Sequence, residues 1–129
     1  MSNKNTILLI QNNIKTLSEL IQECINCGIS EQDIYSVTEP ESAERYMEIA
    51  GISHIIVDAG LYNVVVEAAV EKFSEYFPIT VIITNADETN KTLRMLSDKS
   101  LRYLNDISKL GLYLKPRNVN MYQYIQQAI

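Results

Sequence analysis

Three side chains that could perform chemistry each come directly after a run of mainly apolar residues: Asp58, Thr84 and Lys115. A carboxylate can attack phosphorus to form an aspartyl phosphate, and a neighbouring hydroxyl and ammonium can then hold the phosphoryl oxygens. The three side chains therefore predict phosphoryl transfer to Asp58, provided that the fold brings them together. Each residue also has a purely structural interpretation, with Asp58 as a turn or helix-capping residue and Lys115-Pro116 as the end of a strand.

The apolar pattern predicts alternating strands and helices. Short continuous apolar runs are typical of strands buried on both faces, and they occupy residues 6–10, 34–37, 55–57, 79–83 and 112–114. Helical spacing of apolar residues predicts helices at residues 14–28, 38–51, 65–73, 87–104 and 119–129. Five such units predict an α/β fold, with helices covering both faces of a parallel sheet. In these sheets ligands bind beyond the carboxyl ends of the strands, so we expect the site there.

Length and composition restrict the domain organisation and the class of partner. The 129 residues fit one domain, 1–129, and 47% apolar with 21% charged residues is typical of globular domains. The net charge of −5 argues against direct nucleic-acid binding and against an anionic membrane surface. No apolar run approaches the roughly 20 residues of a membrane span, and the polar start of the chain does not resemble a secretory signal. We therefore expect a cytoplasmic protein.

Cys24 and Cys27 form a C-x-x-C pair, and they are the two cysteines of the chain. Such a pair serves redox chemistry at a helix N-terminus, where the helix dipole stabilises a thiolate, and it forms half of a zinc site when two further ligands exist. Here the pair precedes Gly28, at the predicted end of a helix, and the chain has one histidine, His54. We interpret the cysteines as ordinary half-buried thiols, and His54 as a capping or surface residue.

Taken in order, Asp58, Thr84 and Lys115-Pro116 resemble the motifs of receiver domains from two-component response regulators. The resemblance covers essentially the whole chain and implies a doubly wound, flavodoxin-like (βα)5 sheet with strand order 2-1-3-4-5. It implies that Asp58 is the phosphoacceptor, that Thr84 contacts the phosphoryl group and couples it to conformational change, and that Lys115 bonds to the phosphoryl group. It also implies a signalling module rather than an enzyme, with a histidine kinase and an output domain or protein as partners.

The position at which receiver domains bind Mg²⁺ differs in this chain. In the family, the phosphoacceptor, a backbone carbonyl (here that of Gly60) and two acidic residues after the first strand hold the cation. These acid-pair positions are occupied by Gln11 and Asn12. Because Mg²⁺ prefers carboxylate oxygens, we expect it to bind weakly if at all, through Asp58, Gly60 and Asn12. Phosphotransfer to Asp58 should then be slow or absent.

Two further positions depart from the family pattern. The residue after the family's hydroxyl is usually small, whereas here it is Asn85. The switch aromatic three positions before the lysine is replaced by Leu112, and Tyr113 would face the opposite side of a strand. The usual coupled movement of the threonine and the aromatic is therefore not expected. The stretch between Thr84 and Lys115 is also longer than is common.

Three functions remain open from the sequence. We favour a degenerate receiver, a pseudo-receiver that acts as a protein-interaction or dimerisation module through its fourth and fifth helices. The alternative is a functional receiver with an aspartyl phosphate at Asp58. The third is a flavodoxin-like domain that binds flavin or nucleotide, which would need a phosphate-binding loop rich in Gly, Ser or Thr after the first strand. Residues 11–15 contain no glycine, which argues against the third function.

Overall fold

A five-stranded parallel sheet forms the centre of the computed structural model, which describes residues 5–76, 78–86 and 101–114. The strand order is β2-β1-β3-β4-β5. The strands are β1 (Ile7–Ile10), β2 (Ile34–Val37), β3 (His54–Asp58), β4 (Thr80–Thr84) and β5 (Leu101–Leu104). The predicted α/β fold class and the strand order 2-1-3-4-5 are confirmed.

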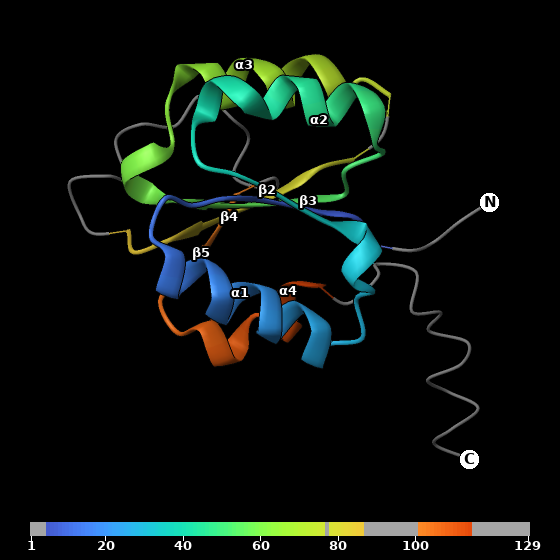
Figure 1. Cartoon of the computed structure of the whole chain (residues 1–129). Coiled ribbons are helices and arrows are strands. Elements are labelled where there is room, and N and C mark those ends of the chain that lie inside the picture. The colour runs from blue at the N-terminus through green and yellow to red at the C-terminus, as the bar shows by residue number, and fades with distance from the viewer. Residues whose placement is uncertain (1–4, 77, 87–100, 115–129) are drawn as a thin grey trace.

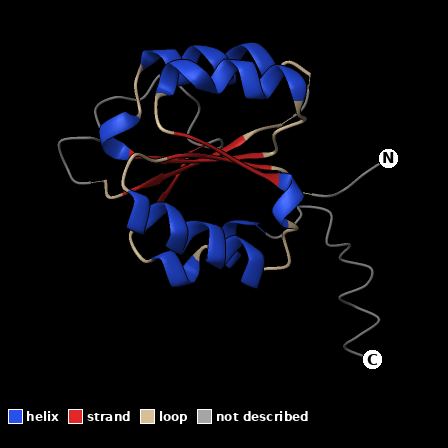
Figure 2. Cartoon of the chain, viewed as in Figure 1, coloured by secondary structure: helices blue, strands red, loops and turns tan. Residues whose placement is uncertain are grey.

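Helices cover both faces of the sheet. They are α1 (Ile14–Asn26), α2 (Ala43–Ile49), α3 (Val64–Phe73) and α4 (Gly111–Leu114). The helices α2 and α3 lie on one face, and α1 and α4 lie on the other (Figure 1, Figure 2). Single 3₁₀ turns lie between elements at Glu31–Asp33, Pro40–Ser42, Ala59–Leu61 and Ile107–Lys109. None of the helices in the described residues is long and apolar enough to cross a membrane.

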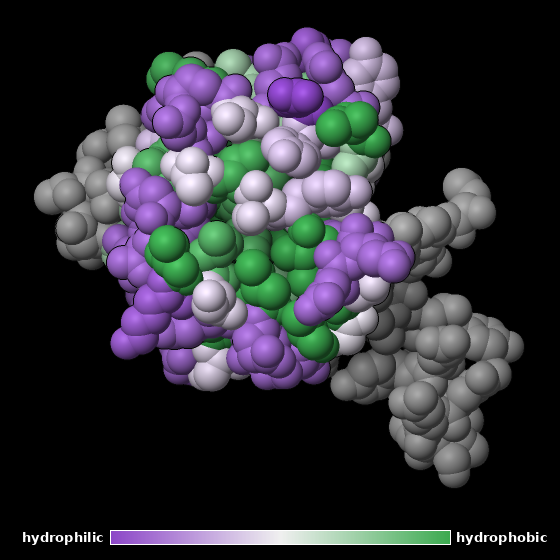
Figure 3. Space-filling model, in the orientation of Figure 1, coloured by the Kyte–Doolittle hydropathy of each residue, from purple (hydrophilic) through white to green (hydrophobic). Residues whose placement is uncertain are grey.

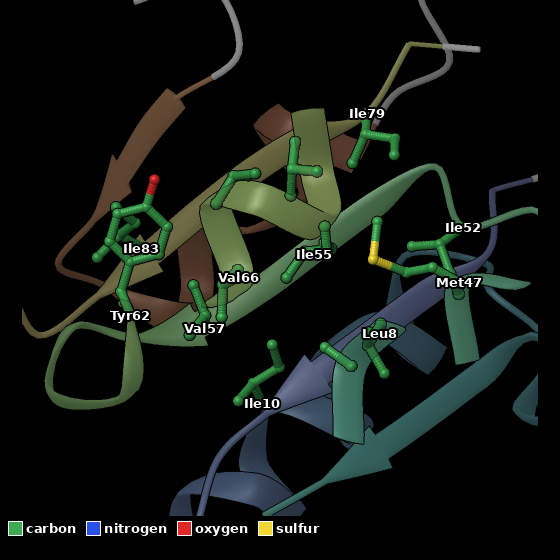
Figure 4. Close-up of a cluster of buried hydrophobic side chains, with 14 of the residues drawn as sticks. Leu8, Ile10, Met47, Ile52, Ile55, Val57, Tyr62, Val66, Ile79 and Ile83 are labelled. Carbon is green, nitrogen blue, oxygen red and sulfur yellow. The ribbon is translucent and has the colours of Figure 1, made fainter. Parts of the chain in front are cut away.

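The central strands are continuous apolar runs because both of their faces are buried. All four residues of β1 are fully buried. Alternate side chains of a strand point to opposite faces, so the strands contribute to two cores. The core beneath α2 and α3 includes Leu8, Ile10, Met47, Ile55, Val57, Val66 and Ile83 (Figure 4). The core against α1 and α4 contains Ile7, Leu9, Leu20, Cys24, Ile56, Ile82, Leu104, Leu110 and Leu114.

Asparagine side chains fix where α1 and α3 begin. The Oδ1 atom of Asn13 accepts a hydrogen bond from the backbone N–H of Thr16 at 3.0 Å. The Oδ1 atom of Asn63 accepts from two N–H groups of the first turn of α3, at 3.0 and 3.2 Å. Such caps satisfy backbone donors that have no partner within the helix. Beyond the end of α1, Gly28 has a φ of 95°, a left-handed conformation that glycine adopts readily.

The last part of the described chain differs from the sequence prediction. Residues 101–104 were predicted to end a helix but form β5. The spacing of Leu101 and Leu104 suits one face of a helix, yet the two side chains pack into different cores, on opposite faces of the sheet. Up to residue 100, the predicted helix 87–104 lies outside the described residues.

The predicted fifth strand, 112–114, was also wrong, because these residues belong to α4. Leu110 and Leu114, four residues apart, are buried, whereas Leu112 is 67% exposed. This pattern is that of an amphipathic helix. Lys115-Pro116 and the predicted last helix, 119–129, lie outside the described residues.

The C-x-x-C pair spans the end of α1. Cys24 is buried and Cys27 is exposed, and both are free thiols. The pKa of Cys24 is raised to about 12, mainly by burial and in smaller part by the neighbouring Cys27 and Glu23. Burial and Glu23 also raise the pKa of Cys27. A redox pair needs a lowered thiol pKa, so the environment agrees with ordinary thiols, one inside the core and one at the surface.

His54 begins β3 and is buried, so the expectation of a surface residue was wrong. Its Nδ1 atom lies 2.8 Å from the hydroxyl of Ser53. The Oγ atom of Ser53 also accepts from the backbone N–H of Thr6 at 2.9 Å. The imidazole is therefore part of the polar contact that joins the starts of β1 and β3.

Alanine substitutions at Leu112 and Leu114 test whether this segment is a helix. On a strand, residues two apart share a face, so both variants would lose similar stability. In α4, Leu114 is buried and Leu112 is exposed. Leu114→Ala should lower the free energy of unfolding by about 2–5 kcal/mol, and Leu112→Ala by less than about 0.5 kcal/mol. Urea denaturation measures both, and equal losses would contradict the helix.

The two thiols should differ in their reaction with Ellman's reagent. Only thiolates react, so Cys27, with its raised pKa, should react slowly at neutral pH and faster as the pH rises. Cys24 should react only after unfolding in guanidinium. The Cys27→Ser variant is the control and should show no reaction in the native state. Two reactive thiols in the native protein would show that Cys24 is accessible.

Candidate functional site

The carboxyl ends of β1, β3 and β4 stop at the same level of the sheet. Ile10 pairs with Val57, and Asp58 pairs with Thr84. Gln11, which directly follows Ile10, therefore lies level with Asp58. Alternation along the strands puts Gln11, Asp58 and Thr84 on the same face, and neighbouring strands are about 4.8 Å apart. An amide, a carboxylate and a hydroxyl thus form a row across three strands.

Both carboxylate oxygens of Asp58 accept hydrogen bonds from uncharged donors. Oδ2 accepts from the backbone N–H of Gly60 at 2.9 Å, and Oδ1 accepts from the side-chain amide of Asn85 at 2.8 Å. The first bond caps the 3₁₀ turn Ala59–Leu61. A Cβ atom at residue 60 would lie 3.0 Å from Oδ2, so glycine permits this close approach. Asp58 therefore serves as a cap at the end of β3, in agreement with its structural interpretation.

Asn85 reaches Asp58 because its backbone adopts a left-handed conformation. Its φ is 58°, and it is the one non-glycine residue with a positive φ among the described residues. Asparagine accepts this conformation more readily than most residues. From the sequence, Asn85 stood out only as larger than the residue usual at this position, and its direct bond to Asp58 was not predicted. An asparagine immediately after a strand was the available signal, because this residue type favours such turns.

The hydroxyl of Thr84 is buried beside this bond. Thr84 is 4% exposed, and its Oγ1 atom has no hydrogen-bond partner among the described residues. Although Thr84 pairs in register with Asp58, the next residue, Asn85, supplies the contact. The structure thus places Thr84 at the expected edge, with a different neighbour bound to the carboxylate.

The two acid-pair positions have different environments. Gln11 is buried, and its Oε1 atom accepts from the backbone N–H of Asn13 at 2.9 Å. Its Nε2 atom is buried without a partner in the described part of the chain. Asn12 is exposed. Gln11 therefore supports the loop that begins α1, and only Asn12 faces solvent.

An amide, and not an ammonium, follows the fifth strand. Lys115 was expected after a strand at 112–114, and that strand prediction was wrong because the segment is helical. The true β5 ends at Leu104, which pairs with Thr84, and the next residue is Asn105. Lys115 itself lies outside the described residues.

Because the fifth strand is residues 101–104 and not 112–114, the switch aromatic is expected at a different position. Leu112 and Tyr113 lie in the helix α4, so they do not face opposite sides of a strand. Tyr103 lies within β5, and the hydroxyl of Tyr113 donates to the Tyr103 carbonyl at 3.4 Å. The aromatic residue of the fifth strand is therefore Tyr103.

The donor groups around Asp58 fit Mg²⁺ poorly. Mg²⁺ prefers carboxylate oxygens in near-ideal octahedral geometry. Of the expected ligands, Asp58 alone is charged, and both of its oxygens already accept hydrogen bonds. Within the described ranges, no three His, Cys, Asp or Glu side chains are grouped so that they could hold a metal ion.

No protein-family model matches the sequence, and no curated protein matches it either. Solved structures match it in fold. The signal receiver domain of an HD domain-containing protein from Pseudomonas fluorescens Pf-5 is 17% identical, with a TM-score of 0.65 over 98% of this chain and 99% of that one. The signal receiver domain of a putative Luxo repressor protein from Vibrio parahaemolyticus is 15% identical, with a TM-score of 0.64 over 95% and 98% of the two chains.

A de novo designed Rossmann 2x3 fold protein also matches, with 12% identity and a TM-score of 0.59 over 95% of this chain and 90% of the designed one. A designed protein shares architecture without ancestry, and identities this low establish the fold alone. The chain thus has the doubly wound α/β fold of the signal receiver domains with which it aligns over nearly its full length.

Proposed function

We propose that the chain, 1–129, is a receiver-like signalling domain of the pseudo-receiver kind, which binds protein partners without forming an aspartyl phosphate. The alignment with two signal receiver domains over nearly their full lengths supports the receiver-like part. One observation carries the degenerate part: Gly60 and Asn85, both uncharged, occupy the two carboxylate oxygens of Asp58.

Charge explains why such a site would transfer phosphate poorly. Phosphoryl transfer to Asp58 brings an anionic phosphate against a carboxylate. Two unit charges about 4 Å apart repel by about 4 kcal/mol at an effective dielectric constant of about 20, which corresponds to roughly a thousandfold in rate. Phosphoryl-transfer sites offset this repulsion with cations. The side chains at Gln11, Asn12 and Asn105 carry no charge and offset none of it.

The bond between Asn85 and Asp58 also holds the ends of two strands together, which a phosphoryl group on Asp58 could otherwise do. It joins the end of β4 to the end of β3 in the unmodified protein. Asn85, the first residue after β4, is therefore already bonded to Asp58. Partner binding at this edge would then be constitutive, with proteins such as a kinase or an output domain as partners. The segments predicted as the fourth and fifth helices, 87–104 and 119–129, were named above as a dimerisation surface, and apart from residues 101–104, which form β5, they lie outside the described residues.

The second candidate is a functional phosphoacceptor receiver. Two observations favour it: the side chain of Asp58 is partly exposed, and Thr84 pairs with it in register. A flavin- or nucleotide-binding function has less support, because Asn13 already caps the first turn of α1, where a phosphate would bind.

Phosphoryl donors should leave Asp58 unmodified. We expect no mass change after incubation with acetyl phosphate and millimolar Mg²⁺, and no bound beryllofluoride signal in fluorine NMR, because the side chains of Gln11, Asn12 and Asn105 offset none of the repulsion at Asp58. The Asp58→Ala variant provides the baseline for both measurements. A mass gain or fluorine resonance that is present in the wild type and lost in Asp58→Ala would favour the second candidate.

Adding charge to the edge of the sheet should create a cation site. Gln11→Glu with Asn12→Asp supplies two carboxylates, and Asn85→Gly frees Oδ1 of Asp58 while keeping a backbone that glycine accepts. This triple variant should bind Mg²⁺ at least about tenfold more tightly than the wild type in isothermal titration calorimetry, because affinity rises with the charge of the oxygen ligands.

The matched control carries the same added charge elsewhere. Gln22 and Asn26 are exposed on α1 and hydrogen-bonded to each other. Gln22→Glu with Asn26→Asp should leave Mg²⁺ affinity close to that of the wild type. If the control gains as much Mg²⁺ affinity as the triple variant, the added carboxylates do not form a specific cation site at the edge of the sheet.

A further inference from the structure

The outer edge of the sheet at β2 presents backbone hydrogen-bonding groups. In the described residues β2 pairs with β1 and ends the sheet. The carbonyl of Val37 accepts from the N–H of Gln11 at 3.1 Å, so Val37 faces β1. Backbone direction alternates along a strand, so Ile34 and Ser36 direct their carbonyls, and Ser36 its N–H, away from the sheet. The N–H of Ile34 is bonded to Glu31.

Apolar side chains flank this edge on both faces of the sheet. Leu17, Ile21 and Ile34 are partly buried against the core on the α1 face. Tyr35 and Tyr46 lie on the other face, with ring centroids 5.7 Å apart. Figure 3 shows hydrophobic residues gathered between α1 and α2, where Figure 1 shows β2, with hydrophilic residues around them.

The strand lacks three features that protect many edge strands from pairing with another chain. Edge strands commonly avoid pairing by means of lysine, proline or a β-bulge. The sequence of β2 is Ile-Tyr-Ser-Val, and its register with β1 is uninterrupted. The central outward residue, Ser36, is small and exposed. A second strand could therefore approach the edge closely.

The charged residues on either side of β2 determine which kind of strand could pair with it. If a second copy of this chain paired antiparallel about Ser36, Asp33 would lie opposite Glu39, and Glu31 opposite Glu41. Like charges placed opposite each other destabilise a strand pair. A second copy is therefore disfavoured, whereas a strand with Lys or Arg at these positions would be complementary.

We propose that the β2 edge binds an extended, basic segment of a partner protein by strand addition. Its backbone pairs with Ile34 and Ser36, its apolar side chains contact the apolar residues that flank the edge, and its cations lie near Glu31 and Glu39. This mode combines main-chain hydrogen bonds with side-chain contacts at alternate positions. The surface is separate from Asp58 and goes beyond the proposed function.

Fluorescence anisotropy with two labelled octapeptides tests the proposal, one of alternating valine and lysine and one of alternating valine and glutamate. The lysine peptide should bind, with an affinity that falls as salt is added, and the glutamate peptide should not. Ser36→Pro removes the outward N–H and keeps the ladder to β1, which proline permits at an edge. It should weaken binding of the lysine peptide at least about tenfold, whereas Ser36→Ala should bind as the wild type does.

Several results would overturn the proposal. Equal binding of the two peptides, no binding of the lysine peptide, or undiminished binding by Ser36→Pro with an unchanged circular dichroism spectrum would each do so. Asp58→Ala should bind the lysine peptide normally, which separates this test from that of the proposed function.

Analytical ultracentrifugation tests whether the β2 edge binds a second copy of this chain instead of a basic segment of another protein. The wild-type chain should not self-associate through β2, because its carboxylates repel. Glu31→Lys with Glu39→Lys turns both contacts between copies into opposite-charge pairs, and this variant should dimerise. Adding Ser36→Pro should return it to a monomer. Dimerisation of the wild type that Ser36→Pro abolishes would show that the occupant is a second copy.

Discussion

The register of three parallel strands, buried on both faces, determines which side chains meet at the candidate site. With α2 and α3 on one face of the sheet and α1 and α4 on the other, β1 has no exposed side chain. Polar chemistry is therefore confined to the points where strands stop. A slip of one residue would turn each side chain to the opposite face and would separate Asp58 from Asn85. The contents of the sheet edge are thus set by which residue follows each strand.

Uncharged hydrogen-bonding groups dominate that edge. Gln11 supports its own loop, Asn85 binds Asp58, and Asn105 follows β5. In this setting Asp58 acts as a turn residue, and within the described part of the chain both of its carboxylate oxygens accept hydrogen bonds from N–H groups. Glutamine and asparagine match glutamate and aspartate in size, so these positions pack as acidic residues would while they carry no charge.

The sequence was sufficient for the first four strands, because continuous apolar runs closed by polar residues have few other interpretations. It also placed Gln11, Asp58 and Thr84 at one edge, since that step follows from a parallel sheet. The sequence did not identify β5, because four residues with leucine at both ends look like part of a helix. Only packing shows that Leu101 and Leu104 enter different cores.

The position of Lys115 was inferred from the predicted strand 112–114, so the sequence gives no strand end for it, and Lys115 itself lies outside the described residues. The bond from Asn85 to Asp58 depends on a backbone torsion, which residue types favour but do not specify. Elements that follow from hydrophobic pattern were therefore predictable, and side-chain partners that follow from local torsion were not.

The bond that joins the ends of β3 and β4 has a consequence for how such a domain could be regulated in a cell. The ends of β3 and β4 are already joined in the unmodified protein, so this contact does not depend on a modification of Asp58. Under the proposed function, control would then fall on how much of the chain is synthesised and degraded, and on which competitors share its partners.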